Sequence, residues 1–339
     1  MTPSKVYYSD LRAKPGLNLL QKLKRLMHAA GIDQIDFENK YTAIKLHFGE
    51  PGNLAFLRPN YAEAVASVVK ELGGKPFLTD CNTLYVGGRK NALDHIDSAY
   101  KNGFVPYATG CHILIGDGLK GTDEVCVPVD GGKYVKEAKI GRAVMDADVF
   151  ISLNHFKGHE CTGFGGALKN IGMGCGSRAG KMEMHSAGKP YAETDACIGC
   201  GRCIGICPTD AIQASMDEAN DILNYKIAEY TKAVLDGRPH FHISLVIDIS
   251  PNCDCHSEND APIVPDVGMF ASFDPVALDV ACADAVNAMP PIENSQLGHM
   301  PHVHGDHFTD SAPTTNWRAC VEHAESLGIG TQSYELIKV

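Results

Sequence analysis

The sequence predicts an α/β protein with a mainly parallel sheet and helices on both faces, carrying an inserted ferredoxin-like 4Fe-4S loop. Short runs of β-forming residues alternate with amphipathic runs of about a dozen residues, which is typical of βαβ units. The 339 residues are 44% hydrophobic, which is enough for a large core. A cysteine run interrupts this alternation. We therefore expect an N-terminal α/β lobe, 1–150, and a C-terminal α/β lobe, 151–339, with the insertion at about 188–214.

In the expected N-terminal lobe, each strand leads into a helix that ends at a turn. Leu19, Leu23 and Leu26 recur at helical spacing and stop at Gly31, which is a typical helix end. The expected elements are strand Val6–Ser9, a helix from Leu17 to Gly31, strand Tyr41–Phe48, helix Tyr61–Leu72, strand Pro76–Thr79, helix Asn91–Lys101, strand His112–Ile115, a β stretch Glu124–Val129 and helix Lys139–Asp146.

The expected C-terminal lobe continues the alternation on both sides of the cysteine run. Asp274 before Pro275 is an N-cap followed by proline in the first turn, so a helix begins there. The expected elements are strand Asp148–Leu153, a helix opened by the glycine-rich stretch Gly163–Gly174, a helix from about Met216 to Leu235, strand Ile243–Ile249, strand Phe270–Phe273, a helix from Pro275 to about Val286, helix Trp317–Leu327 and strand Tyr334–Val339.

The cysteine run has the spacing C-x2-C-x2-C-x3-C-P. This spacing is the ligand run of a [4Fe–4S] cluster, and the glycines between the thiols leave room for the tight turn. A disulfide or a zinc knuckle is the alternative for such thiols. The expected cluster ligands are Cys197, Cys200, Cys203 and Cys207.

A second cluster stays open. In two-cluster ferredoxins the fourth cysteine of such a run serves the other cluster, which would direct Cys207 away from its neighbours. The sequence has no second run of this kind. Cys253 and Cys255 follow the expected strand 243–249, and they are candidates for a missing ligand or for the second cluster.

Polar side chains collect where the expected strands end. In open α/β sheets, ligands bind at the carboxyl ends of the strands, so these side chains are candidates for catalysis. Lysines there would hold an anionic substrate, and histidines would move protons or bind metal. A solvated surface position is the alternative for each residue taken alone. The candidates are Lys45, His47, Asp80, His155, Lys157, His159 and Lys169.

Two further stretches leave two interpretations open. The glycine-rich stretch 163–174 has Leu168 where a dinucleotide fingerprint needs glycine, and Asn170 where a P-loop needs Ser or Thr. It fits either anion binding at a helix start or close backbone packing. Near the C-terminus, a proline-bounded loop fits either a second metal site or a polar surface. That loop contains His299, His302, His304, His307 and Asp306.

Composition and sequence patterns limit the partners and the cellular location that we expect. The net charge of −11 argues against nucleic acid as a partner. The longest apolar runs fall short of the roughly 18 residues of a membrane helix, and the N-terminal residues lack the apolar core of a signal peptide. The 13 cysteines are then expected to be reduced thiols. We expect a cytoplasmic protein with no membrane partner.

The chain resembles the uncharacterised iron–sulfur proteins grouped as domain of unknown function 362 (DUF362). The resemblance rests on AIKLHFGEPG at 43–52, NHFKGH at 154–159, TGFGGALKNIGMG at 162–174, the cysteine run, CDC at 253–255 and DPVALD at 274–279. It implies an α/β body with a ferredoxin-type 4Fe-4S segment, but no settled reaction. Relatives often carry two consecutive ferredoxin runs, whereas this chain has one.

These features together favour an iron–sulfur redox protein of anaerobic metabolism. It would pass electrons between a [4Fe-4S] cluster and a small anionic substrate or cofactor in an adjacent crevice, as an oxidoreductase served by a redox partner protein. One alternative is an electron carrier or maturation partner without chemistry of its own. Another is a non-redox enzyme that uses an open cluster iron as a Lewis acid.

Overall fold

The computed structural model describes residues 2–186, 197, 199–207, 212, 215–216 and 218–339. Its centre is an eight-stranded sheet in the order β12-β1-β11-β10-β7-β2-β3-β4. Strand β11 is antiparallel to its neighbours β1 and β10, and the other neighbouring strands are parallel. The predicted mainly parallel α/β sheet is therefore confirmed. The strands are β1 Ser4–Ser9, β2 Tyr41–Lys45, β3 Lys75–Asp80, β4 His112–Ile115, β7 Val149–His155, β10 His240–Val246, β11 Gly268–Ser272 and β12 Tyr334–Lys338.

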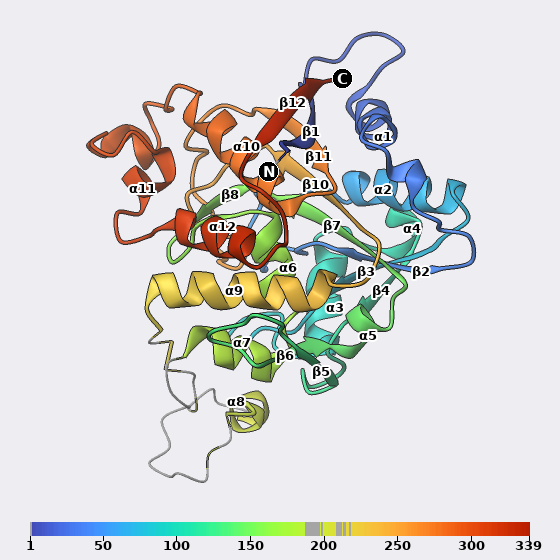
Figure 1. Ribbon diagram of the computed structural model, residues 1–339, viewed down its shortest axis with the longest axis vertical. Helices are drawn as coiled ribbons and strands as arrows, with labels where there is room; N and C mark the ends of the chain where they lie inside the picture. Colours follow the sequence, from blue (N-terminus) through green and yellow to red (C-terminus); the bar gives the residue numbers. More distant parts are fainter. Residues whose placement is uncertain (1, 187–196, 198, 208–211, 213–214, 217) are drawn as a thin grey trace.

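Helices cover both faces of this sheet, as the sequence predicts (Figure 1). Side chains alternate between the faces because the strand period is two residues. Ala43 and Phe150 belong to one hydrophobic core, and Ile44 and Ile151 belong to the other. Helices α1 and α2 pack on one side of the sheet, while α6 and α10 pack on the other, with α9 and α12 stacked outside them. These helices are α1 Leu19–Ala29, α2 Pro59–Glu71, α6 Ala167–Cys175, α9 Asn220–Leu235, α10 Pro275–Asn287 and α12 Trp317–Ser326.

The strand order reverses between β2 and β7. From β2 the chain adds β3 and β4 on one side, and from β7 it adds β10 on the other. Such a switch point leaves a crevice outside the carboxyl ends of the two strands, which is where α/β proteins bind ligands. Helix α6 lies against β2, β7 and β10, so its residues reach this crevice.

Some predicted boundaries are wrong. A helix at 139–146 was expected, but the chain forms a hairpin of β5 Glu124–Pro128 and β6 Glu137–Gly141, and only α5 Arg142–Met145 is helical. Pairing with β5 thus outweighs the helical pattern. The strand expected to reach Phe48 ends at Lys45, and α9 begins later than expected.

Several elements were not predicted. A second hairpin, β8 Lys157–His159 with β9 Gly163–Gly165, follows β7 directly. Helix α7 spans Arg178–His185, and it carries two buried cationic side chains, Arg178 and Lys181. The remaining helices are α3 Ala92–Lys101, α4 Pro106–Thr109, α8 Arg202–Ile206 and α11 His307–Ser311.

The predicted ferredoxin-like insertion at about 188–214 lies largely outside the described residues, and so does Pro208. Within it, the structure describes α8, which Figure 1 places below α7 at the lower end of the molecule. Gly199 and Gly201 have φ of 70° and 64°, a left-handed backbone that favours glycine. Ile204 of α8 packs with Leu84 and Met182 of the body. The body and α8 are therefore joined by an apolar contact.

Strands from both predicted lobes, 1–150 and 151–339, take part in the one sheet, and the division into lobes stays a prediction. In the described parts of the chain, every helix lacks the combination of length and apolar character that crossing a membrane requires.

Candidate functional site

A pocket of about 500 Å³ lies at the switch point, outside the carboxyl ends of β2, β3, β7 and β10. All the predicted strand-end residues and the later cysteine pair line it, although they come from segments up to two hundred residues apart. These residues are Lys45, His47, Asp80, His155, Lys157, His159, Lys169, Cys253 and Cys255. Among the described lining residues, the four cysteines of the run at 197–207 do not appear.

Lys45 and Asp80 form a buried ion pair at the floor of the pocket. Lys45 Nζ lies 3.0 Å from Asp80 Oδ1, and it also donates to Asn170 Oδ1 at 2.8 Å and to the Leu46 carbonyl at 3.0 Å. Burial alone would raise the pKa of Asp80, but Lys45 and His95 bring it well below its usual range. The three donors of the ammonium are therefore used inside the protein.

A second buried pair, Arg89 with Glu50, forms the adjoining wall and was not predicted. Arg89 Nε donates to Glu50 Oε2 at 2.7 Å, and Arg89 Nη1 lies 3.6 Å from Asp80 Oδ2. His47 lies beside this group, and its Nδ1 accepts the backbone N–H of Gly49 at 3.0 Å. Burial, with Arg89 adding to it, lowers the pKa of His47 well below its usual range. His47 is thus a neutral ring whose Nε2 carries the proton.

Asp254 holds two of the predicted residues. It is fully buried, and it accepts from His155 Nδ1 at 2.8 Å and lies 3.1 Å from Lys157 Nζ. The other nitrogen of His155 faces the Ile247 carbonyl at 2.8 Å. Burial would raise the pKa of Asp254, but the charges of His155 and Lys157 lower it. Because both ring nitrogens of His155 have protein partners, this ring positions Asp254 and is not available to a ligand.

His159 is arranged differently. Its Nδ1 accepts the backbone N–H groups of Cys161 and Thr162 at 3.0 and 3.2 Å. A neutral imidazole whose Nδ1 is an acceptor carries its proton on Nε2. His159 therefore presents a donor toward the pocket.

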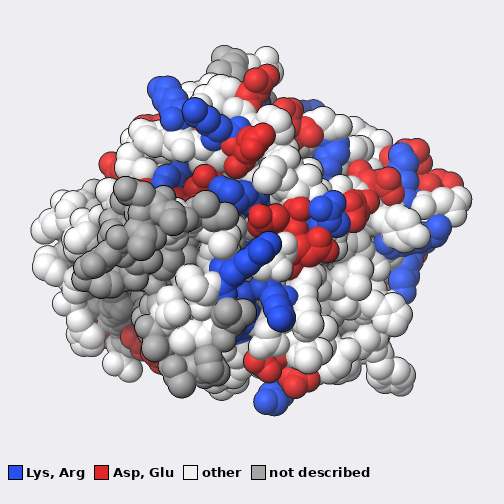
Figure 2. Space-filling model, turned by 90° about the horizontal axis from the view of Figure 1, so that it is seen from below, with Lys and Arg blue, Asp and Glu red and all other residues white. Residues whose placement is uncertain are grey.

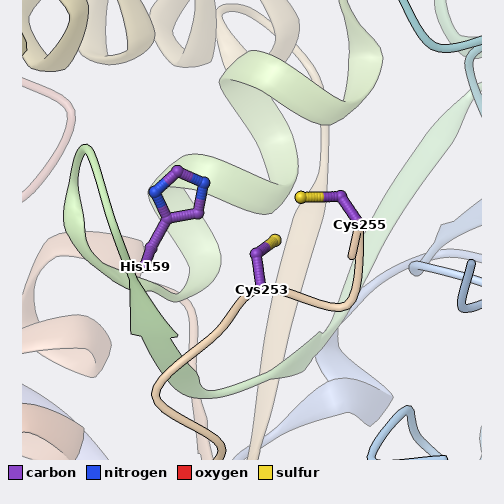
Figure 3. Close-up of side chains that lie close together, drawn as sticks. All are labelled: His159, Cys253 and Cys255. Carbon is purple, nitrogen blue, oxygen red and sulfur yellow. The ribbon is translucent and has the colours of Figure 1, made fainter. Parts of the chain in front are cut away.

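The cysteine pair lies next to this ring. Figure 3 shows the sulfur atoms of Cys253 and Cys255 pointing toward each other, with one nitrogen of the His159 ring facing them. Lys169 Nζ lies 3.1 Å from Cys253 Sγ. A hydrogen bond from Cys255 lowers the pKa of Cys253 well below its usual range despite burial, and Lys169 and Lys157 lower it further. The hydrogen bond with Cys253, together with burial, raises the pKa of Cys255 well above its usual range, so Cys253 is the sulfur of the pair that ionises more readily.

Three groups of side chains place candidate metal-ligand atoms within 4.8 Å of one another, and they share a set of pocket residues. They are His159–Cys253–Cys255, His159–Glu160–Cys161 and Glu160–Cys255–His256. Sulfur and imidazole are ligands that zinc and other transition metals prefer. The described residues thus include Cys/His groups that could hold a metal, but they do not identify that metal as a 4Fe-4S cluster.

Helix α6 is placed by close packing and by a capping carboxylate. Asp279 accepts the backbone N–H groups of Ala167 and Leu168 at 2.6 and 2.9 Å, so these amides are not free to bind an anion. A Cβ at Gly172 would lie 2.2 Å from the Ile227 carbonyl of α9, and a Cβ at Gly174 would lie 2.5 Å from Lys45 Nζ. Of the two interpretations of the glycine-rich stretch, the geometry supports close packing.

A buried polar chain anchors the floor of the pocket from the opposite side. Asn170 of α6 donates to Asn154 Oδ1 at 2.8 Å, and Asn154 donates to Ser152 Oγ at 3.2 Å. Ser152 meets His242 Nδ1 at 2.8 Å, and His242 meets His240 at 2.9 Å. Asn154, Ser152 and His242 are nearly or fully buried. Sequence reasoning missed this chain, although four of its members alternate along β7 and β10, which places them on one face.

The four predicted cluster ligands are partly exposed cysteines. Cys203 lies on α8 and packs against the contact of Ile204 with Leu84, and Leu84 also lines the pocket. Among the described residues, none of the three candidate metal groups includes a cysteine of this run.

In the C-terminal histidine loop, three side chains have partners within the protein. Asp306 caps α11 and accepts the indole N–H of Trp317 at 2.6 Å. His304 Nδ1 meets Asp310 at 2.8 Å, and His307 Nε2 meets the Met289 carbonyl at 2.8 Å. The loop is thus held by protein hydrogen bonds, which favours the polar-surface interpretation.

The molecular face seen from below carries charges of both signs. Figure 2 shows Lys and Arg side chains gathered beside the undescribed residues, with Asp and Glu side chains next to them. Among the described atoms, this face therefore has no field of a single sign that would select a partner by net charge alone.

Comparison with known proteins finds a relative that matches part of this chain. A thylakoid-associated protein of Synechocystis sp. is 30% identical over 131 residues, which are 37% of this chain and 35% of that protein. This chain thus covers about a third of the length of that relative.

Two solved structures are similar at low identity. A crystal structure of a Thermotoga maritima protein is 14% identical with a TM-score of 0.41, covering 70% of this chain and 51% of the other. The lactate racemase apoprotein from Thermoanaerobacterium thermosaccharolyticum is 13% identical with a TM-score of 0.44, covering 84% and 58%.

The family model described as "Domain of unknown function (DUF362)" matches residues 42–284. This range includes the four strands at the switch point, the pocket residues from Lys45 to Cys255, and the cysteine run. With most of its length in the match, the chain belongs to the DUF362 family.

Proposed function

We propose that this chain is an iron–sulfur redox protein that exchanges electrons with a small anionic compound in the switch-point pocket. The observation that most supports this proposal is that one residue contacts both parts of the molecule. Leu84 lines the pocket and also packs on Ile204 from the cysteine run. A centre held by that run would therefore lie beside the bound compound.

The residues of the run fit a [4Fe–4S] cluster. Cys197, Cys200, Cys203 and Cys207 have the ligand spacing of such a cluster, and Gly199 and Gly201 between them adopt the left-handed backbone that a tight ligand loop needs. When bound, such a cluster supplies or accepts single electrons.

Lys181 is the residue best suited to bind the anion. It is 7% exposed and lines the pocket, and it donates to the Gly176 carbonyl at 2.5 Å. Among the described residues, no carboxylate lies within 4.0 Å of its ammonium group, unlike those of Lys45 and Lys157. An ammonium group without a carboxylate partner attracts an anionic ligand. The protonated Nε2 of His159 would then donate to the ligand or give up the proton that accompanies an electron.

The pocket argues against one alternative, an electron carrier without chemistry of its own. An electron carrier without chemistry of its own needs no pocket, whereas about 500 Å³ is the size of a small-ligand site. A redox partner protein remains part of the proposal.

The test starts with iron and sulfide analysis of protein purified without oxygen, followed by electron paramagnetic resonance with and without small carboxylate anions. We expect about four irons and four sulfides per chain and an anion-dependent signal that K181M weakens. K139M is the matched control, because Lys139 is paired with Glu183 outside the pocket. Protein without sulfide would rule the proposal out.

A further inference from the structure

We propose that Cys253 and Cys255 form a redox-active dithiol that cycles with a disulfide at the floor of the pocket. The inference rests on the proposed function, because the electrons come from the iron–sulfur centre. It adds a two-electron site to a protein whose other expected centre carries one electron at a time.

The backbone holds the two sulfurs together. The Cys253 carbonyl accepts the His256 N–H at 3.0 Å, which closes a turn around the pair. The residue between them, Asp254, is fixed by His155 and Lys157 through its side chain, and its carbonyl accepts the Glu50 N–H at 2.9 Å. Both sulfurs lie within the 4.8 Å group with His159, and they face each other (Figure 3).

The side chains around Cys253 suit a thiolate that acts as nucleophile when the disulfide forms and as leaving group when it is reduced. Lys169 Nζ contacts Cys253 Sγ at 3.1 Å, and a cation at this distance stabilises thiolate as nucleophile and as leaving group. Five other cysteines, by contrast, are buried without a cation at hydrogen-bond distance among the described residues. They are Cys81, Cys111, Cys175, Cys282 and Cys320.

Two features favour thiol chemistry over a resident metal ion at this spot. The ammonium group of Lys169 occupies a contact position on Cys253, and it would repel a cation there. The Nδ1 of His159 accepts two backbone N–H groups, so its Nε2 carries a proton and is a donor, not a ligand.

The dithiol and the disulfide differ by two electrons and one proton. On oxidation, the Cys253 thiolate and the Cys255 thiol give two electrons and one proton to a reducible anionic compound bound in the pocket, and the S–S bond forms. On reduction, the S–S bond takes up two electrons and breaks; the iron–sulfur centre of the proposed function would supply them one at a time. Cys253 returns as thiolate beside Lys169, and Cys255 takes up the proton, which the Nε2–H of His159 in the same 4.8 Å group can donate.

The experiment equilibrates anaerobic full-length protein with mixtures of reduced and oxidised dithiothreitol, alkylates the free thiols, and maps them by mass spectrometry. We expect a reversible loss of two alkylation sites, at Cys253 and Cys255, with the unalkylated peptide lighter by two hydrogen atoms. C253S and C255S should each abolish this change. C161S is the matched control, because Cys161 lines the same pocket, and among the described residues no lysine makes a hydrogen bond to its sulfur.

Three results would overturn the inference: both thiols stay alkylatable in every mixture, either one pairs with another cysteine, or a stoichiometric metal is lost in C253S or C255S. Iron and sulfide are measured on the same samples. Normal iron without the disulfide would refute only the dithiol, whereas a disulfide without iron would refute only the proposed function.

Discussion

At the scale of single residues, we expect the contact between Lys169 and Cys253 to set the reactivity of the thiol. Replacing Lys169 with Met removes the ammonium group 3.1 Å from Cys253 Sγ. We expect the pKa of Cys253 to rise, so that the pH at which its alkylation by iodoacetamide reaches half the maximal rate moves upward by roughly one unit. Alkylation rates over a series of pH values, resolved by peptide, measure this midpoint.

The conservative variant K169R separates charge from packing. A guanidinium group keeps the positive charge beside the sulfur, so K169R should keep the midpoint of the pH profile close to that of the unmodified protein. Equal midpoints in K169M and the unmodified protein would mean that Lys169 does not stabilise the thiolate.

The sequence predicts polar residues of the pocket where each lies at or just past the end of its own strand, as Lys45, His155 and Lys157 do. It does not predict what these residues do, because their roles depend on partners from other elements. His155, expected to carry protons, has both nitrogens bonded and positions Asp254 instead. Arg89 was missed because its partner Glu50 is 39 residues away, beyond any local pattern.

At the scale of elements, α6 depends on its contact with α9. A Cβ at Gly172 would meet the carbonyl oxygen of Ile227 at 2.2 Å, and a backbone atom cannot move aside alone. We expect G172A to lower the free energy of unfolding by roughly 1–3 kcal/mol, the usual cost of overpacking. Denaturant unfolding followed by circular dichroism measures this difference.

G176A provides the control for this contact. The added Cβ would meet the end of the flexible Met184 side chain at 2.8 Å, so we expect a smaller loss. If both variants lose the same stability, the helix contact is not the cause.

Asp279 couples the start of α6 to pH. Burial raises the pKa of Asp279 to about 7, although the Leu168 and Ala167 amides oppose this. Between about pH 4 and pH 7, the folded state thus keeps the proton on Asp279, whereas the unfolded state releases it near pH 4. The contribution of this proton to the stability of the folded state is complete below about pH 4 and is lost as the pH rises to 7. Across this window, the stability of the unmodified protein should fall relative to D279N by roughly 2–4 kcal/mol.

Denaturant unfolding at several pH values measures that difference. The exposed residue Asp123 supplies the control, since D123N should follow the unmodified protein across the range. A pH-independent difference between D279N and the unmodified protein would show that Asp279 is ionised throughout.

At the scale of the whole molecule, the strand order creates the pocket. The alternation of strands and helices predicts a parallel sheet, but it does not say that β7 pairs with β2 and β10. Only that pairing brings the ends of strands separated by more than a hundred residues to one crevice. The expected helix at 139–146 fails for the same reason, since β6 is defined by its partner β5 and not by its own periodicity.

We expect the cysteine run to lose its cluster without unfolding of the α/β body. In the described residues, the apolar contact of α8 with the body is the small group of Leu84, Met182 and Ile204, while the sheet is covered by other helices. We expect C200S to lose iron and sulfide but to keep its far-ultraviolet circular dichroism, with a main unfolding transition changed by less than about 1 kcal/mol. C126S, at an exposed cysteine of β5, is the control that should keep both. If the sheet instead unfolds together with the loss of iron, the cluster is part of the folding core, and a small apolar contact cannot be what joins the two.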